Sequence, residues 1–256
     1  MIKGLYSAHS AMASAWEYQE VLANNIANAN TAGFRREVAA HQSFDDVLLT
    51  QQAPTPAPLS ARVQAIVGQI GTGKFIAEFQ TDFSGGSLQA TGQELDLAIE
   101  QGFFAVEGPE GETFYTRNGR FDRDANGMLV TSHGYPVLDD AGGPIVLPDG
   151  AVRVERDGSI FVGDDPDGGP VAQLAILDFP PAGLERAGEA YFITDAEGLP
   201  VEGNILQGFL EGSNTNMTEE LTTLLTVQRV YQANQALLSS LDDTLDTATG
   251  ELGRMS

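Results

Sequence analysis

Apolar side chains recur at intervals of three and four residues over the first part of the chain. They stand at Ile2, Leu5, His9, Met12, Trp16, Gln19, Ala23 and Ile26, with two polar members. This spacing predicts an α-helix from Ile2 to about Asn28, roughly 40 Å long at about 1.5 Å per residue. The helix runs into an Asn-rich segment that ends at Gly33. Because Asn and Gly tolerate a left-handed backbone, we expect a sharp change of direction near Gly33.

A second helical pattern fills the end of the chain. Asn216 followed by Glu219 resembles a capping box, and no glycine or proline interrupts the sequence from there to Ala248. Two apolar seams run side by side along it, the first at Leu221, Leu224, Gln228, Tyr231, Gln235, Leu238 and Leu245 and the second at Val227, Val230, Asn234, Leu237 and Leu241. Two stripes favour a helix with several neighbours, whereas burial in the core of its own domain is the alternative.

The middle of the chain has a different pattern. Short apolar runs such as Leu97–Ile99 and Phe103–Val106 alternate with turn dipeptides. The dipeptides are Asn118-Gly119, Asn126-Gly127, Asp149-Gly150, Asp157-Gly158 and Glu197-Gly198. Hairpin turns at this spacing predict an antiparallel β domain. The chain also contains a proline-rich, extended stretch at residues 53–58.

Together these patterns predict an α+β fold, in which long terminal helices pair as a coiled-coil-like stalk and a mainly antiparallel β domain is inserted between them. The predicted divisions are residues 1–42 for the first helix and its exit, 43–75 for an extended linker, 76–212 for the β domain and 213–256 for the second helix. We expect the two helical ends to act together, because a lone β domain has no need of them.

Charge separates the middle of the chain from its ends. The net charge is −23, yet residues 1–42 carry three bases and three acids, and residues 217–256 carry six acids and two bases. The acidic middle argues against nucleic acid as a partner, because phosphate binding needs a basic surface. No apolar run is long enough to predict a membrane span, and the N-terminal sequence does not resemble a cleaved secretory signal.

Motifs for catalysis or ligand binding are weak. Residues 68–75 match the spacing of a phosphate-binding loop, but Phe75 stands where magnesium binding needs Ser or Thr. Residues 122–127 copy half of a calcium loop, but the twelfth position is His133, so a β-turn is favoured. The chain has no cysteine, and its three histidines lack ligand spacing. We therefore predict no catalytic residue, cofactor or metal site, and a protein that is not an enzyme.

Four stretches, in order, resemble the flagellar basal-body rod and hook proteins. They are Leu22–Arg36, Leu97–Phe104, Tyr115–Phe121 and Gly208–Asn216. Within them the family-motif residues are Asn24, Asn25, Asn28, Thr31, Gly33, Phe34, Tyr115, Arg117, Gly119, Phe121, Glu211, Ser213 and Asn214. The chain length resembles that of the proximal and the distal rod proteins. The tail at Leu252–Arg254 and the Gly143–Ile145 region look more like the proximal rod protein, while residues 70–73 look more like the distal one.

The resemblance implies a structural subunit that self-assembles through its terminal helices into a hollow drive shaft. Such a subunit transmits torque and passes exported proteins. Its implied partners are further copies, other rod and hook proteins, and the flagellar type III export apparatus. Its implied location is the basal body outside the cytoplasm, reached without signal cleavage. The predicted assembly interface comprises Leu5, Met12, Trp16, Ile26, Leu221, Leu224, Tyr231 and Leu238. The alternative function is an extracytoplasmic adhesin or scaffold.

Overall fold

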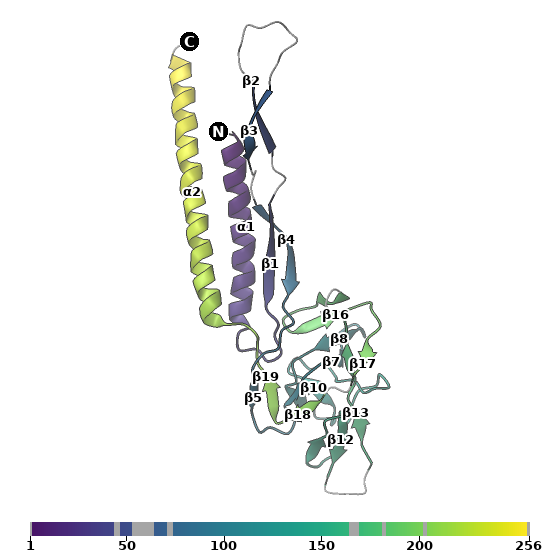
Figure 1. Cartoon of the computed structure of the whole chain (residues 1–256). Coiled ribbons are helices and arrows are strands. Elements are labelled where there is room, and N and C mark those ends of the chain that lie inside the picture. The colour runs from purple at the N-terminus through teal and green to yellow at the C-terminus, as the bar shows by residue number, and fades with distance from the viewer. Residues whose placement is uncertain are drawn as a thin grey trace. The chain divides into compact units, whose positions relative to one another are not determined.

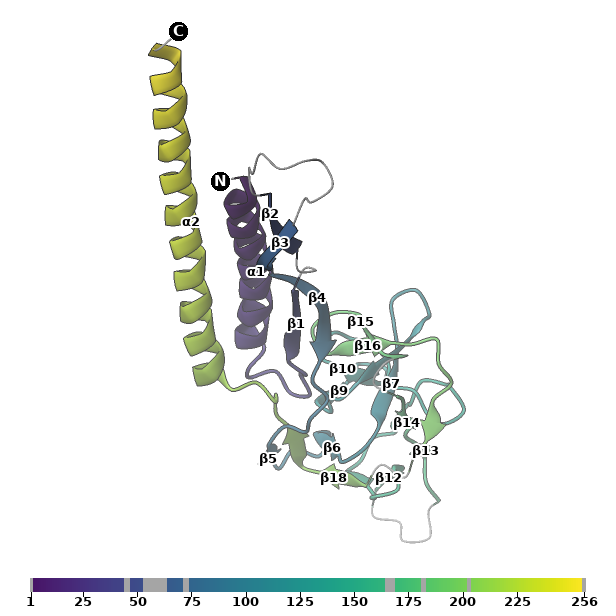
Figure 2. The same ribbon diagram turned by 45° about the horizontal axis from the view of Figure 1, so that its top comes forward.

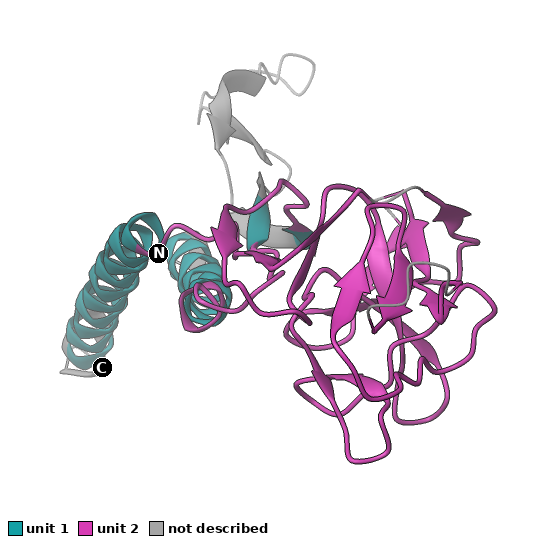
Figure 3. Cartoon of the chain, turned by 90° about the horizontal axis from the view of Figure 1, so that it is seen from below, with its two compact units in different colours: residues 1–24, 37–80, 218–256 teal, residues 25–36, 81–217 magenta. Residues whose placement is uncertain are grey.

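Long helices form at both ends of the chain, as the apolar spacing predicted. The computed structural model describes residues 2–43, 47–52, 64–70, 74–163, 169–180, 183–201 and 204–254. Helix α1 is Ile2–Ala27 and helix α2 is Met217–Arg254, which begins directly after the predicted cap Asn216. The chain divides into two compact units (Figure 3). Unit 1 comprises residues 1–24, 37–80 and 218–256, and unit 2 comprises residues 25–36 and 81–217.

The face of α1 that is buried is not the predicted seam. The buried positions follow the spacing of Ala8, Ala15 and Leu22, whereas Trp16 is 57% exposed and Leu5 is 37% exposed. Each of these buried positions comes one residue before a member of the predicted seam, so the two faces are neighbours on the helix. The larger side chains mark the face that does not pack within this chain. Small alanine side chains mark the buried face. The predicted seam is left at the surface, with Met12 and Ile26 half-buried.

Helix α2 buries one stripe, and only in part. The half-buried stripe takes members from both predicted seams, at Leu224, Val227, Tyr231, Asn234, Leu238, Leu241 and Leu245. Exposed apolar side chains flank it on either side, with Leu221 and Leu225 on one flank and Val230 and Leu237 on the other. Among the side chains described for α2, only Glu220 is buried. The helix therefore has more apolar surface than this chain covers.

The described residues of unit 1 also form four strands. The strands are β1 (Glu37–Ser43), β2 (Val47–Gln52), β3 (Gln64–Ile70) and β4 (Lys74–Thr81). β1 pairs with β4, and β2 pairs antiparallel with β3. The predicted extended linker at residues 43–75 thus contains strands. Its proline-rich stretch at 53–58 lies outside the described residues. Within unit 1, α1 and α2 run in opposite directions (Figure 1, Figure 2).

Unit 2 contains the β-rich middle of the chain. Its strands are β5 (Leu88–Ala90), β6 (Leu97–Ile99), β7 (Phe103–Glu107), β8 (Thr113–Thr116), β9 (Phe121–Arg123), β10 (Leu129–Thr131), β11 (Val152–Val154), β12 (Ser159–Val162), β13 (Ala172–Gln173), β14 (Ile176–Asp178), β15 (Glu185–Arg186), β16 (Tyr191–Ile193), β17 (Leu199–Pro200), β18 (Ile205–Gln207) and β19 (Phe209–Glu211). The largest sheet has the order β15-β16-β8-β7-β14-β17, with antiparallel pairs. Smaller pairs are β6–β18, β5–β19 and β9–β10, beside the sheet β11-β12-β13. The α+β class is confirmed.

Two of the five predicted turns join paired strands. Asn126-Gly127 connects β9 to β10, and Asp157-Gly158 connects β11 to β12. At the first of these, the Asp124 carboxylate accepts hydrogen bonds from the amides of Asn126 and Met128, at 2.9 and 2.7 Å. These bonds hold the favoured β-turn at the calcium-like stretch.

The core of unit 2 is apolar and fully enclosed. Phe104 and Val106 of β7 are completely buried, and the Phe104 ring meets Phe121 edge-on at 5.1 Å between centroids. A smaller aromatic cluster surrounds Phe103 and Phe192. Within the described residues, no helix combines the length and apolar character needed to cross a membrane.

Candidate functional site: a buried polar junction

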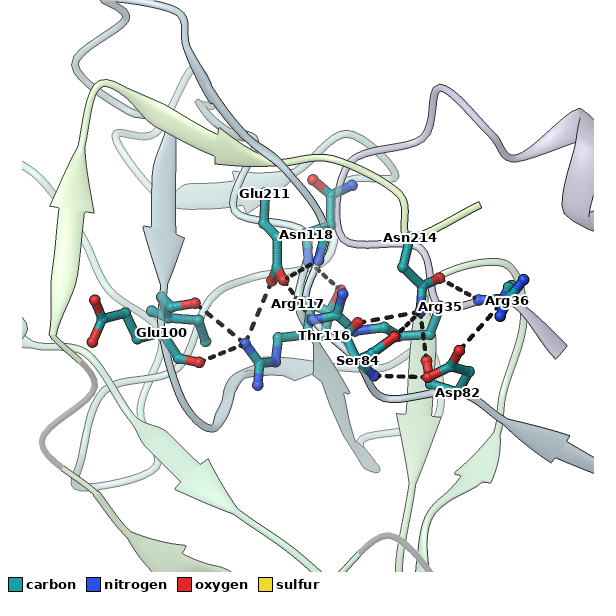
Figure 4. Close-up of polar contacts among 12 residues, drawn as sticks. Arg35, Arg36, Asp82, Ser84, Glu100, Thr116, Arg117, Asn118, Glu211 and Asn214 are labelled. Atoms are coloured by element: carbon teal, nitrogen blue, oxygen red, sulfur yellow. Dashed lines mark hydrogen bonds and ion pairs between the residues drawn. The ribbon is translucent and has the colours of Figure 1, made fainter. Parts of the chain in front are cut away.

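A buried carboxylate lies where three distant segments of unit 2 meet (Figure 4). Glu211, at the end of β19, accepts a hydrogen bond through Oε1 from Arg35 Nη2 at 2.7 Å and from the Gly86 amide at 3.0 Å. Its Oε2 atom lies 3.4 Å from Arg117 Nη1. Arg35 is fully buried and Glu211 is 5% exposed. The junction therefore links the exit from α1, the segment after β8 and the approach to α2.

The charges in this junction depend on one another. Burial lowers the pKa of Arg117, and the Glu211 carboxylate opposes that shift. Arg117 also donates to the carbonyls of Ile99 and Glu100 and lies 5.2 Å from the Phe103 ring centroid. Among the described residues, Nε and Nη1 of Arg35 and Nε of Arg117 are buried without a hydrogen-bond partner. Glu211 is thus the carboxylate that holds two buried guanidinium groups, and removing it would leave both without a counter-charge.

Gly33 brings the exit loop directly onto the Arg117 backbone. Its φ is +68°, and its amide donates to the Glu211 carbonyl at 2.7 Å. A β-carbon at Gly33 would lie 2.3 Å from the Arg117 carbonyl carbon and from the Asn118 amide nitrogen. Both the conformation and the space therefore require glycine. The predicted change of direction at this residue is confirmed.

Arg186 contacts both Phe34 and Arg35. The Arg186 guanidinium lies 5.0 Å from the centroid of the fully buried Phe34 ring and donates to the Arg35 carbonyl. A cation over an aromatic face adds to the apolar burial of the ring.

A second polar group lies beside the first. Asn214 accepts a hydrogen bond from the Arg36 amide at 2.8 Å and donates to the Asp82 carbonyl at 2.7 Å and the Ser84 carbonyl at 3.2 Å. Arg36 Nε lies 3.1 Å from Asp82 Oδ2. Hydrogen bonds from Ser84, ahead of the Arg36 ion pair, lower the pKa of Asp82 below its ordinary value. The Asn214 side chain thereby links the two sequence segments of unit 2, which are residues 25–36 and 81–217.

The remaining family-motif residues build the surroundings of the junction. A β-carbon at Gly119 would lie 1.6 Å from the Leu97 carbonyl oxygen, so this glycine permits a close backbone approach. Phe121 packs in the core, and Tyr115 packs against Phe179 at 4.4 Å between ring centroids. Burial raises the pKa of the Tyr115 hydroxyl.

At the end of α1 the asparagines differ in burial. Asn25 and Asn28 are buried and Asn24 is exposed. The Asn28 side chain accepts from the Thr31 hydroxyl at 3.0 Å, and Ser213 Oγ accepts from the Thr215 amide at 3.1 Å. These are short-range contacts that shape the two loops.

Reasoning from the sequence missed part of the junction. Arg35 and Arg36 stand inside a predicted stretch but were not named as site residues. Asp82, Ser84 and Arg186 had no local signal. Gly86 could have been found, because the Gly85-Gly86 pair marks a close approach; a β-carbon there would lie 1.9 Å from the Gly212 carbonyl oxygen.

Three segments of the chain match family models. Residues 5–35 match the flagella basal body rod protein, 98–162 match the D1 domain of the flagellar hook protein FlgE/F/G, and 206–251 match the C-terminal part of the flagellar basal body rod FlgEFG protein. The flagellar basal-body rod protein FlgG of Agrobacterium fabrum is 36% identical over 88% of this chain and 89% of its own length. FlgG of Bacillus subtilis is 34% identical over 96% of this chain and 97% of its own.

The chain belongs to the flagellar basal-body rod protein family. It is a structural subunit of the flagellar rod and not an enzyme. The adhesin or scaffold alternative is not supported by these relatives. A protein named FlgF, from Mesorhizobium japonicum, is also similar, at 34% identity over the full length of both chains. The proximal assignment therefore stays a prediction.

In this rod protein each matched segment supplies one charged residue of the junction. Arg35 ends the first segment, Arg117 lies in the second and Glu211 lies in the third. The three segments are far apart in sequence, and Glu211 stands 176 positions after Arg35. The junction is therefore the place where the parts shared with the family are joined.

Proposed function

We propose that this rod protein polymerises through α1 and α2 into a hollow shaft that transmits torque and lets exported subunits pass. The observation that carries the proposal is the incomplete burial of α2. This helix has 38 residues and would be roughly 57 Å long. Leu225 on one flank and Leu237 on the other remain about half exposed, at 56% and 48%. Such apolar surface on a long helix is typical of one that packs against other subunits.

The same reasoning extends to α1. Trp16 and Leu5 lie on its exposed face, and Tyr6 beside them is 69% exposed. Covering a large apolar side chain contributes about 1.5–3 kcal/mol of burial free energy. Repeated along two helices, this contribution supports coiled-coil-like pairing between subunits. The interface we propose comprises Leu5, Met12, Trp16, Ile26, Leu221, Leu224, Tyr231 and Leu238, together with the exposed Leu225 and Leu237 on the flanks of α2.

In this proposal the predicted divisions take distinct roles. Residues 1–42 and 213–256 form the tube core, residues 43–75 link it to the β domain, and residues 76–212 lie outside the tube. The partners would be other rod and hook proteins of the flagellar axis. Export would use the flagellar type III apparatus without a cleaved signal peptide, to a position in the basal body outside the cytoplasm. The ends carry much less net charge than the middle, zero for residues 1–42 and −4 for residues 217–256, which supports their close packing, since repulsion between copies would arise chiefly from the acidic middle.

The test is a double variant, Leu225→Ser with Leu237→Ser. Both side chains are exposed in the single chain, so we expect the unfolding transition of the β domain to be unchanged. Polymers of the purified protein should be lost, as seen by sedimentation and electron microscopy, and a strain whose chromosomal copy is replaced should lose motility. Thr226→Ser, on an exposed position of the same helix, is the matched control. Polymers and motility at the wild-type level in the double variant would refute the proposal.

A further inference from the structure

A free strand edge in unit 2 leads into a cleft lined by carboxylates. The edge is β5, which is exposed along its whole length and pairs on one side with β19. The cleft has a volume of about 700 Å³ and is lined by residues 91–96 and 120–122, so it begins at the residue that follows β5. We call β5 and this cleft the edge surface. It lies on unit 2 and includes no residue of either helix.

The backbone of β5 offers hydrogen bonds along its outer side. The Thr91 amide donates to the Gly208 carbonyl at 2.8 Å, and the Gly212 amide donates to the Ser87 carbonyl at 2.8 Å. In an antiparallel ladder alternate residues face the partner strand, so the N–H and C=O groups of Leu88 and Ala90 point away from β19. No other described strand pairs with that side. An unpaired edge of this kind is a template for one more strand.

The edge also carries apolar side chains. Leu88 is 51% exposed, and Phe209 on the paired strand is 36% exposed. Leu88 and Phe209 lie on the same face of the pair in diagonal positions, because Phe209 is opposite Ala90 and Leu88 is two residues before Ala90. These two side chains would be covered by an apolar residue of an added strand.

Asp96 gives the cleft its chemical character. It is 7% exposed and lines the cleft, and in the described part of the chain its carboxylate forms no hydrogen bond or ion pair. Its backbone is held by the Gly208 amide, which donates to the Asp96 carbonyl at 2.8 Å. Asp96 stands opposite Arg120 across an isolated β-bridge, and a carboxylate that lines a cleft in this way favours a cation there.

The charges around Asp96 select the sign of the occupant. Glu94 and Asp122 also line the cleft, and Arg120 is its one basic side chain. Three carboxylates against one guanidinium leave a net charge of −2. Part of Glu94 is already used, because its Oε2 accepts from the Val152 amide at 3.1 Å. The cleft therefore fits a positive group and excludes a negative one.

We propose that the edge surface binds an extended segment of another polypeptide, which adds a strand to β5 and places an arginine or lysine against Asp96. The strand supplies backbone hydrogen bonds, an apolar residue covers Leu88 and Phe209, and the basic residue gives specificity. The role is separate from helix-driven polymerisation, because none of these groups belongs to α1 or α2.

The probe is a short fluorescent peptide that alternates valine and threonine and ends in two arginines. We expect it to bind the full-length protein, measured by fluorescence anisotropy. A peptide with glutamate in place of arginine, and one with N-methylated backbone amides, should not bind. Asp96→Asn should weaken the arginine peptide about tenfold or more, because it removes the buried charge. Leu88→Pro should also weaken it, because proline removes the outward N–H while leaving the pairing with β19.

Stability separates binding from a structural role. Asp96→Asn should leave the unfolding midpoint unchanged, because the shape of the side chain is kept and the Asp96 carboxylate makes no hydrogen bond or ion pair within the described residues. Glu110→Gln, an exposed acid outside the cleft, should change neither stability nor binding. Arg120→Gln should strengthen binding, because it removes the competing cation. Failure of the arginine peptide to bind wild-type protein, equal binding of the arginine and glutamate peptides, or unchanged affinity in Asp96→Asn would overturn the proposal.

Discussion

The β domain and the terminal helices use apolar residues in different ways. In unit 2, Phe104, Val106 and Phe192 are completely enclosed. Along α2, a stripe of leucines is only half-buried, and further leucines on its flanks are exposed. Unit 2 can satisfy its core by itself, whereas the helices retain apolar surface that a single chain does not cover. One chain thus combines a self-sufficient domain with helices that are suited to assembly.

The largest expected effect is at the junction of unit 2. Glu211→Ala should lower the free energy of unfolding by about 5 kcal/mol, because two buried guanidinium groups lose their counter-charge. Chemical denaturation, followed by the circular dichroism of the β-sheet signal, measures this loss. Glu112→Ala, at an exposed position, is the control and should have little effect. A loss at Glu211 no larger than that of the control would show that the junction does not stabilise unit 2.

The next prediction compares the loss of stability from a substitution in the buried core of unit 2 with that from a substitution on the exposed surface of α2. Phe104→Ala should cost about 3–5 kcal/mol, because it leaves a cavity beside Phe121. Leu225→Ala should change the stability of the single chain by no more than about 0.5 kcal/mol, because Leu225 is already exposed. Both are measured by urea unfolding of unassembled protein. Similar losses at the two positions would break the comparison between the units.

A smaller effect is expected where a glycine is required for two reasons. Gly33→Ala should cost about 3 kcal/mol, because strain at positive φ is joined by a collision with the Arg117 backbone. Gly92→Ala is the matched control, since its φ is +71° but no atom lies within 4 Å of the added β-carbon. The control should cost about 1 kcal/mol from strain alone. Equal thermal shifts in the two variants would mean that the collision is relieved by movement of the loop.

The smallest effect is a dependence on pH. The pKa of Asp82 is lowered in the folded protein, chiefly by hydrogen bonds from Ser84, so its contribution is present above the ordinary aspartate pKa of about 4. That contribution is lost as the pH falls through the lower folded value. Asp82→Asn should therefore reduce the fall in stability below about pH 4 while changing stability less at acid pH than at neutral pH. Identical pH profiles for wild type and variant would contradict this assignment.

Local patterns were enough to predict the elements of this fold. The first helix was expected over residues 2–28 and spans Ile2–Ala27, and the second begins directly after the predicted cap Asn216. Runs such as Leu97–Ile99 form strands as expected. These predictions succeed because helix periodicity, capping and strand alternation depend on neighbours in the sequence. The buried face of α1 was not predicted, because Ala8 and Ala15 have little apolar signal and Trp16 has a strong one.

The junction shows where sequence reasoning ends. Gly33 could be recognised as a turn residue, since its tolerance of positive φ is a property of glycine itself. Its contact with Arg117 arises only when distant segments are brought together. The same is true of the hydrogen bonds that join Asn214 to Arg36 and to Asp82.

The sequence by itself determined the helices at both ends, the β-rich middle and the resemblance to rod proteins, because each depends on local order along the chain. The tertiary structure decided which helix faces are covered and which carboxylate meets which guanidinium. Glu211 has no sequence feature that selects Arg35 and Arg117 over the other bases. The pairing follows from burial, because buried charges are stable only when an opposite charge lies beside them.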